Sequence, residues 1–396
     1  MLVVALGPLA LSSFVPALPT IARDFVVDEG VAQLALSLSM MSIAFTTLLY
    51  GPLSDRFGRR PVLIGTFAMG MVGSALGWAA QDMAGLILAR VVQAAGIASG
   101  MVVARAIVQD VYGSERMASV MGNITGAMVI APLAGPIIGG LLVEAVSWRA
   151  VFAMITLLGA ATVVLMLWRL PETNQTPTSV FSAASVRRDL ATLLKNRDFL
   201  RFSLYVVLAQ SGLLTFIGGA PLIVEGVYGH PASAYGLYVS IMALGYMIGS
   251  LGAGRLGSVL ARGGMMWIGT SLSIIGLGLA LVLAAAEVPD LFYLSWTIAL
   301  GAVGVGFALP AAQSGFIAAA PRIPGSASSL SGFLQMMMLA VSTQFVGLVQ
   351  EADTAVPTVA TMFAMVALAP VALWLVQPRH PQAPAFLKSA AFAHRP

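Results

Sequence analysis

Two long uncharged runs of the sequence meet at Gly51-Pro52-Leu53-Ser54-Asp55-Arg56-Phe57-Gly58-Arg59-Arg60-Pro61. Gly51 and Gly58 permit close backbone approach and unusual dihedral angles, and Pro61 suits the first turn of a new helix. The charge of this region is confined to Asp55 and the arginines of the turn. The stretch therefore predicts a tight basic turn between two apolar helices, which is typical of a loop at a membrane surface.

The composition of the whole chain is that of a membrane protein. Of its 396 residues 59% are hydrophobic and 9% are charged, and the mean hydropathy is +0.93. Soluble domains carry about 25% charged residues. The charges lie in short clusters between long uncharged runs, as required by a bilayer core about 30 Å thick that takes about 20 apolar residues per helix.

Twelve apolar runs, uncharged except for Arg90, are long enough to cross a membrane. Their length distinguishes them from strands, and open sheets are excluded because backbone groups without hydrogen bonds are costly in lipid. We therefore predict an all-α polytopic membrane protein with twelve transmembrane helices. The runs are 2–22, 30–54, 61–81, 84–104, 117–143, 150–168, 202–224, 231–254, 263–286, 291–321, 323–350 and 354–378.

The distribution of basic residues predicts the orientation of these helices. With a cytoplasmic N-terminus, the inside segments hold most of the 20 lysines and arginines, whereas the outside loops keep Arg23 and Arg149 among many acids. An excess of basic residues inside is the usual determinant of topology. We expect a multi-pass protein of the inner, or cytoplasmic, membrane with both termini in the cytoplasm.

The longest polar stretch divides the chain into two sets of six helices. Residues 171–201 are rich in Ser, Thr, Asn and basic residues and predict a cytoplasmic linker with a surface helix at 186–195. The charged turn has a degraded counterpart at 252–262, after the eighth helix. Duplicated halves are typical of secondary transporters. We expect two pseudo-symmetric six-helix bundles at 1–170 and 202–378, with the linker between them and a cytoplasmic tail at 379–396.

Other classes of protein are disfavoured. The chain has no cysteine, and its three histidines do not cluster, so we expect neither a metal nor a cofactor. The basic pI of about 9.6 arises from loops between spans, and we expect no nucleic-acid partner. The first run is too long for the apolar core of a signal peptide and has no basic start. The chain begins directly in this span, and a short cytoplasmic leader ahead of it is an open alternative.

Asp55 is the informative residue of the charged turn. A carboxylate at the membrane boundary can cap the N-terminus of a neighbouring helix and pair with arginines. Such contacts make a latch that closes in one conformation and opens in another. The alternative is a basic loop that only fixes topology, which explains the arginines but not the glycines or Asp55.

The string GPLSDRFGRRP at 51–61 resembles the loop signature of the major facilitator superfamily. Four further strings resemble the bicyclomycin-resistance (Bcr/CflA) branch of drug/proton antiporters within it, and the similarity covers nearly the whole chain. They are FVPALPTIARDF at 14–25, LARVVQAAGIASGMVVARAIVQD at 88–110, GAMVIAPLAGPIIGG at 126–140 and PGSASSLSGFLQ at 324–335.

The resemblance implies a gate at the cytoplasmic face. In the family, an acid of helix four pairs with an arginine of the charged turn, which would join Asp110 to Arg59. Asp55 would dock at the N-terminus of helix eleven. The expected gate residues are Asp55, Arg59, Arg60, Asp110, Gly325 and Ser326.

Arg90 is a charge well inside an apolar run. Burial there costs about 2.5–3.5 kcal/mol on insertion scales, so an intramembrane arginine indicates function. The resemblance implies a part in proton transfer. In the alternative, Arg90 extends to the outer surface or bonds backbone carbonyls.

The chain departs from the family in helix one, where many relatives carry an acid and this chain has Ser12. All sixteen acids fall in loops or at helix ends. A proton-coupled transporter needs a group that titrates during its cycle. The candidates are therefore Asp55, Asp110 and Glu225, with Arg90 as an electrostatic modulator.

Helix five combines small residues with a helix breaker. Small residues let helices pack backbone to backbone, and proline removes a hydrogen bond and bends the helix. The resemblance implies a seal between the halves that prevents leak during antiport, whereas ordinary close packing is the alternative. The seam residues are Gly135, Pro136, Gly139 and Gly140, with Gly122 and Gly126 earlier in the run.

A small-molecule site in such a protein is expected to be apolar with a few polar handles. Twenty-one methionines add adaptable surface suited to varied ligands. Each candidate residue has packing as its alternative role. The candidates near mid-membrane are Phe14, Gln210, Phe216, Tyr246, Gln313, Gln335 and the run from Met336 to Met338.

We therefore predict a secondary transporter that exports hydrophobic or amphipathic compounds in exchange for protons, sufficient as a monomer. A metabolite exporter or facilitator for an amino acid or sugar, without proton coupling, is the second hypothesis, and Ser12 favours it. A membrane enzyme or scramblase would need catalytic or metal-binding groups inside the spans, and the sequence offers none. We therefore expect no enzyme activity.

Overall fold

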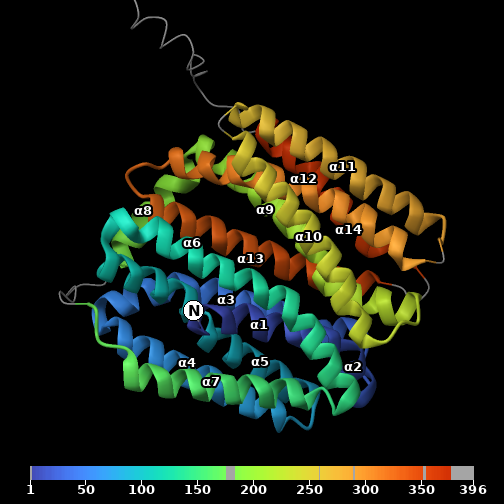
Figure 1. Cartoon of the computed structure of the whole chain (residues 1–396), viewed down its shortest axis with the longest axis horizontal. Helices are drawn as coiled ribbons and strands as arrows, with labels where there is room; N and C mark the ends of the chain where they lie inside the picture. Colours follow the sequence, from blue (N-terminus) through green and yellow to red (C-terminus); the bar gives the residue numbers. More distant parts are fainter. Residues whose placement is uncertain (1, 175–182, 258, 289, 351–353, 376–396) are drawn as a thin grey trace, which may run out of the picture.

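The computed structural model describes residues 2–174, 183–257, 259–288, 290–350 and 354–375, and their side chains outside 113–133, 183–186 and 375. These residues form helices and connecting turns without a strand (Figure 1). By length and composition, eleven helical segments among them could cross a membrane. The all-α prediction is therefore confirmed.

The first half of the chain runs through seven helices and one 3₁₀ turn. Several of these elements are shorter or longer than the uncharged runs, because polar residues continue some helices beyond the apolar part. The elements are α1 (Leu2–Phe14), η1 (Val15–Ala17), α2 (Leu18–Phe25), α3 (Glu29–Phe57), α4 (Arg59–Trp78), α5 (Met83–Ile97), α6 (Ser99–Ala145) and α7 (Arg149–Arg169).

The second half begins with the helix of the linker. The next helix after the linker helix ends in a π-helical segment, η2. The elements are α8 (Ala183–Lys195), α9 (Arg197–Pro221), η2 (Leu222–Val227), α10 (Ala232–Leu256), α11 (Arg262–Ala285), α12 (Leu291–Ala318), α13 (Pro324–Val349) and α14 (Val356–Leu375). The surface helix expected in the linker is present as α8, and α9 begins within the residues expected to be linker.

Helix α6 contains two spans, although the sequence predicted a loop near 105–116 between separate helices. An ideal Cβ at Gly100 would lie 2.2 Å from the Val3 carbonyl oxygen, and one at Gly139 would lie 2.1 Å from that of Ser13. A straight helix would separate Gly100 and Gly139 by about 58 Å, whereas Val3 and Ser13 are about 15 Å apart along α1. The chain therefore turns back between 99–112 and 134–145, which adds a twelfth span to the eleven.

The helices pack as two groups that meet along two lines. Within the first half, α4 packs against α5 and α7, and α1 packs against α6; within the second, α12 packs against α10 and α11, and α9 against α14. Between the halves, α3 packs against α13, and α6 packs against α10 (Figure 1). This arrangement agrees with the predicted pair of six-helix bundles.

Glycines allow the closest helix contacts. An ideal Cβ at Gly304 of α12 would lie 2.3 Å from both the Gly269 carbonyl oxygen and the Ser273 Oγ of α11. An ideal Cβ at Gly249 of α10 would lie 2.0 Å from the Val303 carbonyl oxygen. In lipid, such backbone-to-backbone packing replaces the hydrophobic driving force as the source of helix association.

The segment after α7 caps the N-terminus of α4. Gly58, at the N-cap position of α4, has a φ of 97° and no side chain with which to cap the helix. Instead, Glu172 accepts hydrogen bonds from the backbone N–H groups of Arg59 (2.9 Å) and Arg60 (3.0 Å). Glu172 also accepts from the backbone of Thr173 and Asn174. A helix N-terminus carries unpaired N–H groups and partial positive charge, so a carboxylate there is stabilising.

These hydrogen bonds shift the titration of Glu172. Partial burial by itself raises the pKa of the carboxyl, but four backbone N–H groups favour the ionised form and the net pKa lies below the ordinary value of 4.5. The stabilisation is therefore fully present above about pH 4.5 and is lost as the pH falls through the folded-state pKa.

We predict that Gly304→Val lowers the thermal stability of the detergent-purified protein, because the added side chain must separate α12 from α11. Overpacking of this kind costs about 1–3 kcal/mol. The control is Gly264→Val in α11, where an ideal Cβ has no neighbour within 4 Å. Equal unfolding temperatures for the two variants would contradict the close packing of α11 and α12.

A second prediction concerns the cap of α4. Glu172→Ala should cost about 1 kcal/mol at neutral pH, as expected for loss of a helix cap. The deficit relative to the unmodified protein should shrink below about pH 4.5, where the native carboxyl becomes protonated. Thermal unfolding in detergent across this pH range measures the difference. Glu172→Gln retains one acceptor oxygen and should be intermediate; a deficit independent of pH would refute the capping role.

Candidate functional site

A buried arginine of the charged turn joins two carboxylates. Arg59 Nε donates to Asp110 Oδ2 at 3.0 Å, and its NH1 group donates to Ser54 Oγ at 2.7 Å and to Asp55 Oδ1. The side chain of Arg59 is 10% exposed, against 49% for Asp55. Three helices, α3, α4 and α6, thereby meet at one guanidinium, and charge-assisted bonds of this kind are the stronger ones.

Two linker residues complete this cluster. Thr173 Oγ1 donates to Asp110 Oδ2 at 3.2 Å, and Asn174 Nδ2 donates to the Asp55 carbonyl oxygen at 2.7 Å. With Glu172, they form a short strap over the charged turn. This strap was not predicted from the sequence. The available signal was that the helix after Gly58 has no capping side chain of its own, so that a partner must come from elsewhere.

Arg60, which we grouped with the gate, points to a different neighbour. Its NH2 group donates to the Leu167 carbonyl oxygen at 2.9 Å, near the end of α7. That carbonyl belongs to the last turn of the helix, where a cation compensates unpaired C=O groups. Arg60 therefore connects α4 to α7, while Arg59 contacts the carboxylates.

The N-terminus of α13 has a partner other than the expected one. Ser326 Oγ donates to Asp189 Oδ2 of the linker helix α8 at 2.8 Å. An ideal Cβ at Gly325 has no neighbour within 4 Å. Within the described contacts, Asp55 and Ser326 share no partner, so the structure does not bring the two ends of the expected latch together.

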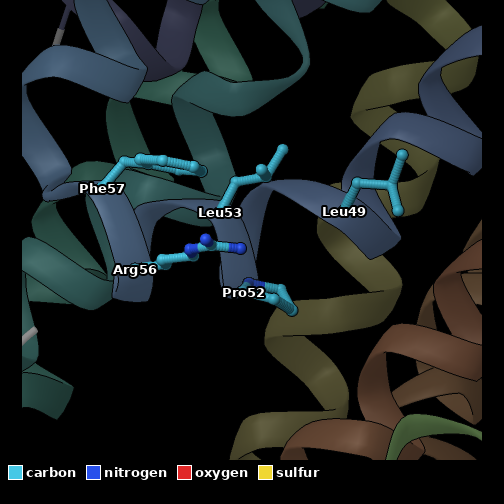
Figure 2. A pocket seen from close by; sticks show the side chains of 5 residues that line it. All are labelled: Leu49, Pro52, Leu53, Arg56 and Phe57. Carbon is cyan, nitrogen blue, oxygen red and sulfur yellow. The ribbon is translucent and has the colours of Figure 1, made fainter. Parts of the chain in front are cut away.

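The C-terminal end of α3 presents an open apolar face. Side chains on successive turns line a hollow of about 180 Å³, which Figure 2 shows from close by. The guanidinium of Arg56 lies 5.0 Å from the centroid of the Phe57 ring. The lining residues are Leu49, Pro52, Leu53, Arg56 and Phe57.

Arg90 is buried in the first half, with 2% exposure, and does not extend to the outer surface. Its NH1 group donates to Gln93 Oε1 and, at 3.4 Å, to the Ala10 carbonyl oxygen. The guanidinium carbon lies 4.0 Å from the centroid of the Phe14 ring, and Nε is buried without a hydrogen-bond partner. Gln93 in turn donates to Ser74 Oγ at 2.5 Å. The charge is thus held by a carbonyl, an amide and an aromatic face, with no carboxylate among its contacts.

A second arginine lies in a helix beyond the predicted run. Helix α6 continues past residue 104, so Arg105 lies inside it, and its side chain is exposed, whereas Arg90 is buried. Sequence analysis placed Arg105 in a loop. Helix continues there because no proline interrupts it and the Asp110 side chain is paired with Arg59.

The two halves are joined by several polar contacts. Arg23 NH2 of α2 donates to Glu225 Oε2 of η2 at 3.3 Å, and the other oxygen of Glu225 is buried without a partner. Glu144 Oε1 of α6 accepts from the backbone N–H of Ser233 in α10 at 2.7 Å. Gln344 of α13 donates to the Gly30 carbonyl oxygen of α3 at 2.9 Å.

The small residues of the second arm of α6 face two different helices. Ideal Cβ atoms at Gly135 and Gly139 would lie 2.0 Å from Ser12 Oγ and 2.1 Å from the Ser13 carbonyl oxygen in α1. One at Gly140 would lie 2.7 Å from the Ala232 carbonyl oxygen, in the other half. Pro136, between them, is buried. The side chains at 122 and 126 lie outside the described residues.

The candidate cavity residues differ in their burial. Phe14 and Phe216 are buried, and Gln313 is exposed. The others are half-buried: Gln210, whose Oε1 has no hydrogen-bond partner, Tyr246, Gln335 and the run from Met336 to Met338. The carbonyl oxygen of half-buried Gln335 accepts from Ser211 Oγ at 3.1 Å. None of them lines the hollow on α3 or a second one of about 410 Å³ between α1 and α7.

Comparison with known proteins supports the fold. A solved bacterial homologue of the human lysosomal transporter Spinster, described as inward-facing and unoccupied, matches 99% of this chain and 96% of its own, with a TM-score of 0.73 and 15% identity. A likeness at this identity concerns the fold alone.

The sequence is also similar to named bacterial proteins. The chain is 28% identical over 367 residues to the uncharacterized MFS-type transporter YdgK of Bacillus subtilis, covering 90% of this chain and 89% of the relative. It is 26% identical over 380 residues to a bicyclomycin resistance protein homolog of Haemophilus influenzae, covering 95% of this chain and 94% of the relative. It is 28% identical over 340 residues to multidrug resistance protein D of Escherichia coli, covering 84% of each.

A family model matches residues 1–343, which is most of the chain. That match agrees with the twelve spans, the two packed halves and the paired charged turn described above. The chain belongs to the Major Facilitator Superfamily.

Proposed function

We propose that the protein is a secondary active transporter that exports hydrophobic or amphipathic small molecules in exchange for protons by alternating access. One observation carries the proposal: the contacts between the halves gather at the outer end, and the inner end of α3 lies open. Along α3 and α13, Gly30 packs against Gly347, and the Ser37 hydroxyl donates to the side-chain oxygen of Gln344. Beyond the ring contact of Phe45 with Phe333, one face of the inner end of α3 is exposed, namely Leu49, Leu53 and Phe57, while Tyr50 and Ser54 are buried.

The export of drug-like molecules is supported by the relatives. Their names include bicyclomycin resistance and multidrug resistance, and the similarity spans most of both chains. No histidine, cysteine, aspartate or glutamate group of the described residues is arranged to hold a metal. The apolar spans and half-buried Met336 suit weakly polar ligands.

We infer that the Arg59 cluster is the inner gate. In the present arrangement Asp55 lies against Arg59, and Asp189 occupies Ser326 at the start of α13. When the inner ends of α3 and α13 approach, Asp55 reaches the N-terminus of α13, whose dipole favours a carboxylate. The strap from Glu172 to Asn174 holds the turn in place during this movement.

Proton coupling is assigned to Arg90 and Glu225. Glu225 pairs with Arg23 across the outer face, so protonation of this carboxylate would remove an ion pair that joins the halves. Arg90 contributes a fixed positive charge next to helix one. The close contacts of Gly135 and Gly139 with α1, and of Gly140 with α10, make the α6 arm a seam that limits leak while the halves move.

The second candidate is a metabolite exporter or facilitator without proton coupling. Ser12 favours it, since its hydroxyl bonds the Pro8 carbonyl oxygen at 2.7 Å and supplies no titratable group in helix one. The two candidates differ in whether export depends on the proton gradient. We place the protein in the inner membrane with both termini in the cytoplasm, and a single chain contains the whole pathway.

Export can be tested in an efflux-deficient bacterial host. Cells that express the protein should retain less of a fluorescent drug than cells with empty vector. A protonophore should abolish the difference if export is proton-coupled. Lower retention that persists with the protonophore would favour the uncoupled candidate, and equal retention in all cases would exclude drug export.

Two substitutions test the assigned roles. Arg90→Ala and Asp55→Asn should each reduce export by at least about tenfold while leaving membrane insertion normal, because each removes a charge used during the cycle. Arg169→Gln, at the inner end of α7, is the control for loss of a basic residue. Full activity of either test variant would remove that residue from the mechanism.

Orientation can be tested on the chain as it stands, because it has no cysteine. Val146→Cys lies in the α6–α7 turn with 71% exposure, and Val259→Cys lies between α10 and α11 with 79%. A membrane-impermeant maleimide added to intact cells should label the first and not the second. The reverse pattern would place the termini outside.

A further inference from the structure

We propose that Gln33 of α3 sets how readily one end of the interface between the halves opens, because its buried amide weakens the closed arrangement of that end. The inference rests on the proposed function, in which this end, the outer one in the proposed orientation, opens once in each transport cycle. It follows from one amide nitrogen that is buried without a hydrogen-bond partner.

The side chain of Gln33 lies in a notch made by two glycines of the second half. An ideal Cβ at Gly347 of α13 would lie 2.7 Å from both Cβ and Cγ of Gln33, and one at Gly218 of α9 would lie 2.8 Å from Gln33 Nε2. Close-packed interiors do not accept such approaches, so a larger residue at either position would displace Gln33. The side chain is 1% exposed. Gln33 therefore reaches from the first half into the second, between α9 and α13.

Two glutamines at this end of the interface differ in how their amides are satisfied. Gln33 Nε2 has no hydrogen-bond partner among the described residues. By contrast, Gln344 Oε1 accepts from Ser37 Oγ at 2.7 Å, and Gln344 Nε2 donates to the Gly30 carbonyl oxygen at 2.9 Å. A buried polar group without a partner has lost its bonds to water and gained none in return, which destabilises the arrangement that buries it.

Separation of α3 from α13 at this end would return the Gln33 amide to water. The cost of its burial disappears in that arrangement, so Gln33 favours opening, whereas the two bonds of Gln344 favour closure. A protein that alternates between two arrangements needs them close in free energy, because a large difference leaves one of them almost unpopulated. Gln33 therefore offsets part of the stability that glycine packing and the bonds of Gln344 give to the closed end.

The test is the rate at which a cysteine buried at this end reacts in the purified, detergent-solubilised protein. Thr343→Cys supplies the cysteine, because Thr343 of α13 is 0% exposed and its Oγ1 lies 3.9 Å from Met40 Sδ of α3. The chain has no other cysteine, so a maleimide reports on this position alone. When opening is faster than the reaction, the rate of labelling is proportional to the population of the open arrangement.

We expect Gln33→Met to slow the labelling of Thr343→Cys by about fivefold or more, because methionine keeps the length of the side chain and removes the unpartnered amide. Gln344→Met is the matched control. It removes two bonds between the halves and should accelerate the labelling by about threefold or more. Val146→Cys, which is 71% exposed, should be labelled at the same rate in all backgrounds.

Labelling that is unchanged or faster with Gln33→Met would overturn the inference. Slower labelling with both Gln33→Met and Gln344→Met would also overturn it, since the effect would then come from added apolar surface. Gln33→Leu also lacks the amide and keeps the test valid if Gln33→Met does not fold. The proposed function fails separately: the expected order of rates without export by cells contradicts transport, and export with an unchanged rate contradicts only the role of Gln33.

Discussion

The low polarity of the bilayer is the constraint on which this structure depends. A charge is costly there, and so is a backbone group without a hydrogen bond. The chain responds with helices throughout its described spans, with carboxylates outside the apolar runs, and with glycines where helices approach most closely, as at Gly249 and Gly304. Buried charges that depart from this pattern, Arg90 above all, are therefore candidate functional residues.

The same constraint explains the charged turn. Arg59 is nearly buried and is matched by Asp55 and Asp110, so that three helices share one charge-assisted cluster. Burying such a charge is tolerable when its partners are in place, and removing one partner leaves the remaining charges with the full cost of desolvation. The proposed gate role of this cluster rests on that dependence of each charge on its partners.

Much of the fold could be predicted from the sequence, because run length and basic loops follow directly from bilayer thickness and topology. The linker helix α8 and the span positions were predicted in this way. Boundaries were less certain: polar residues such as Asp110 continue α6 past its apolar run, since tertiary partners satisfy them. The pairing of Arg59 with Asp110 came from a family resemblance and not from spacing.

Long-range partners could not be predicted. Asp189 and Ser326 lie 137 residues apart, and no local pattern indicates their contact. The same is true of Arg23 and Glu225, on opposite halves. Such pairs depend on how helices are arranged in three dimensions, and a single sequence records the residue types without the arrangement. The depth of Arg90 could be predicted, but not the Phe14 ring that covers it.

The cap on α4 also bears on biosynthesis. Glu172 lies 113 residues beyond Arg59, the first residue of the helix that it caps. During translation, α4 enters the membrane long before Glu172 leaves the ribosome. The N–H groups in the first turn of α4 therefore have no carboxylate cap until Glu172 has been synthesised. The charged turn can acquire its final shape only after α7 has been inserted, which makes this turn one of the last parts of the amino-terminal bundle to mature.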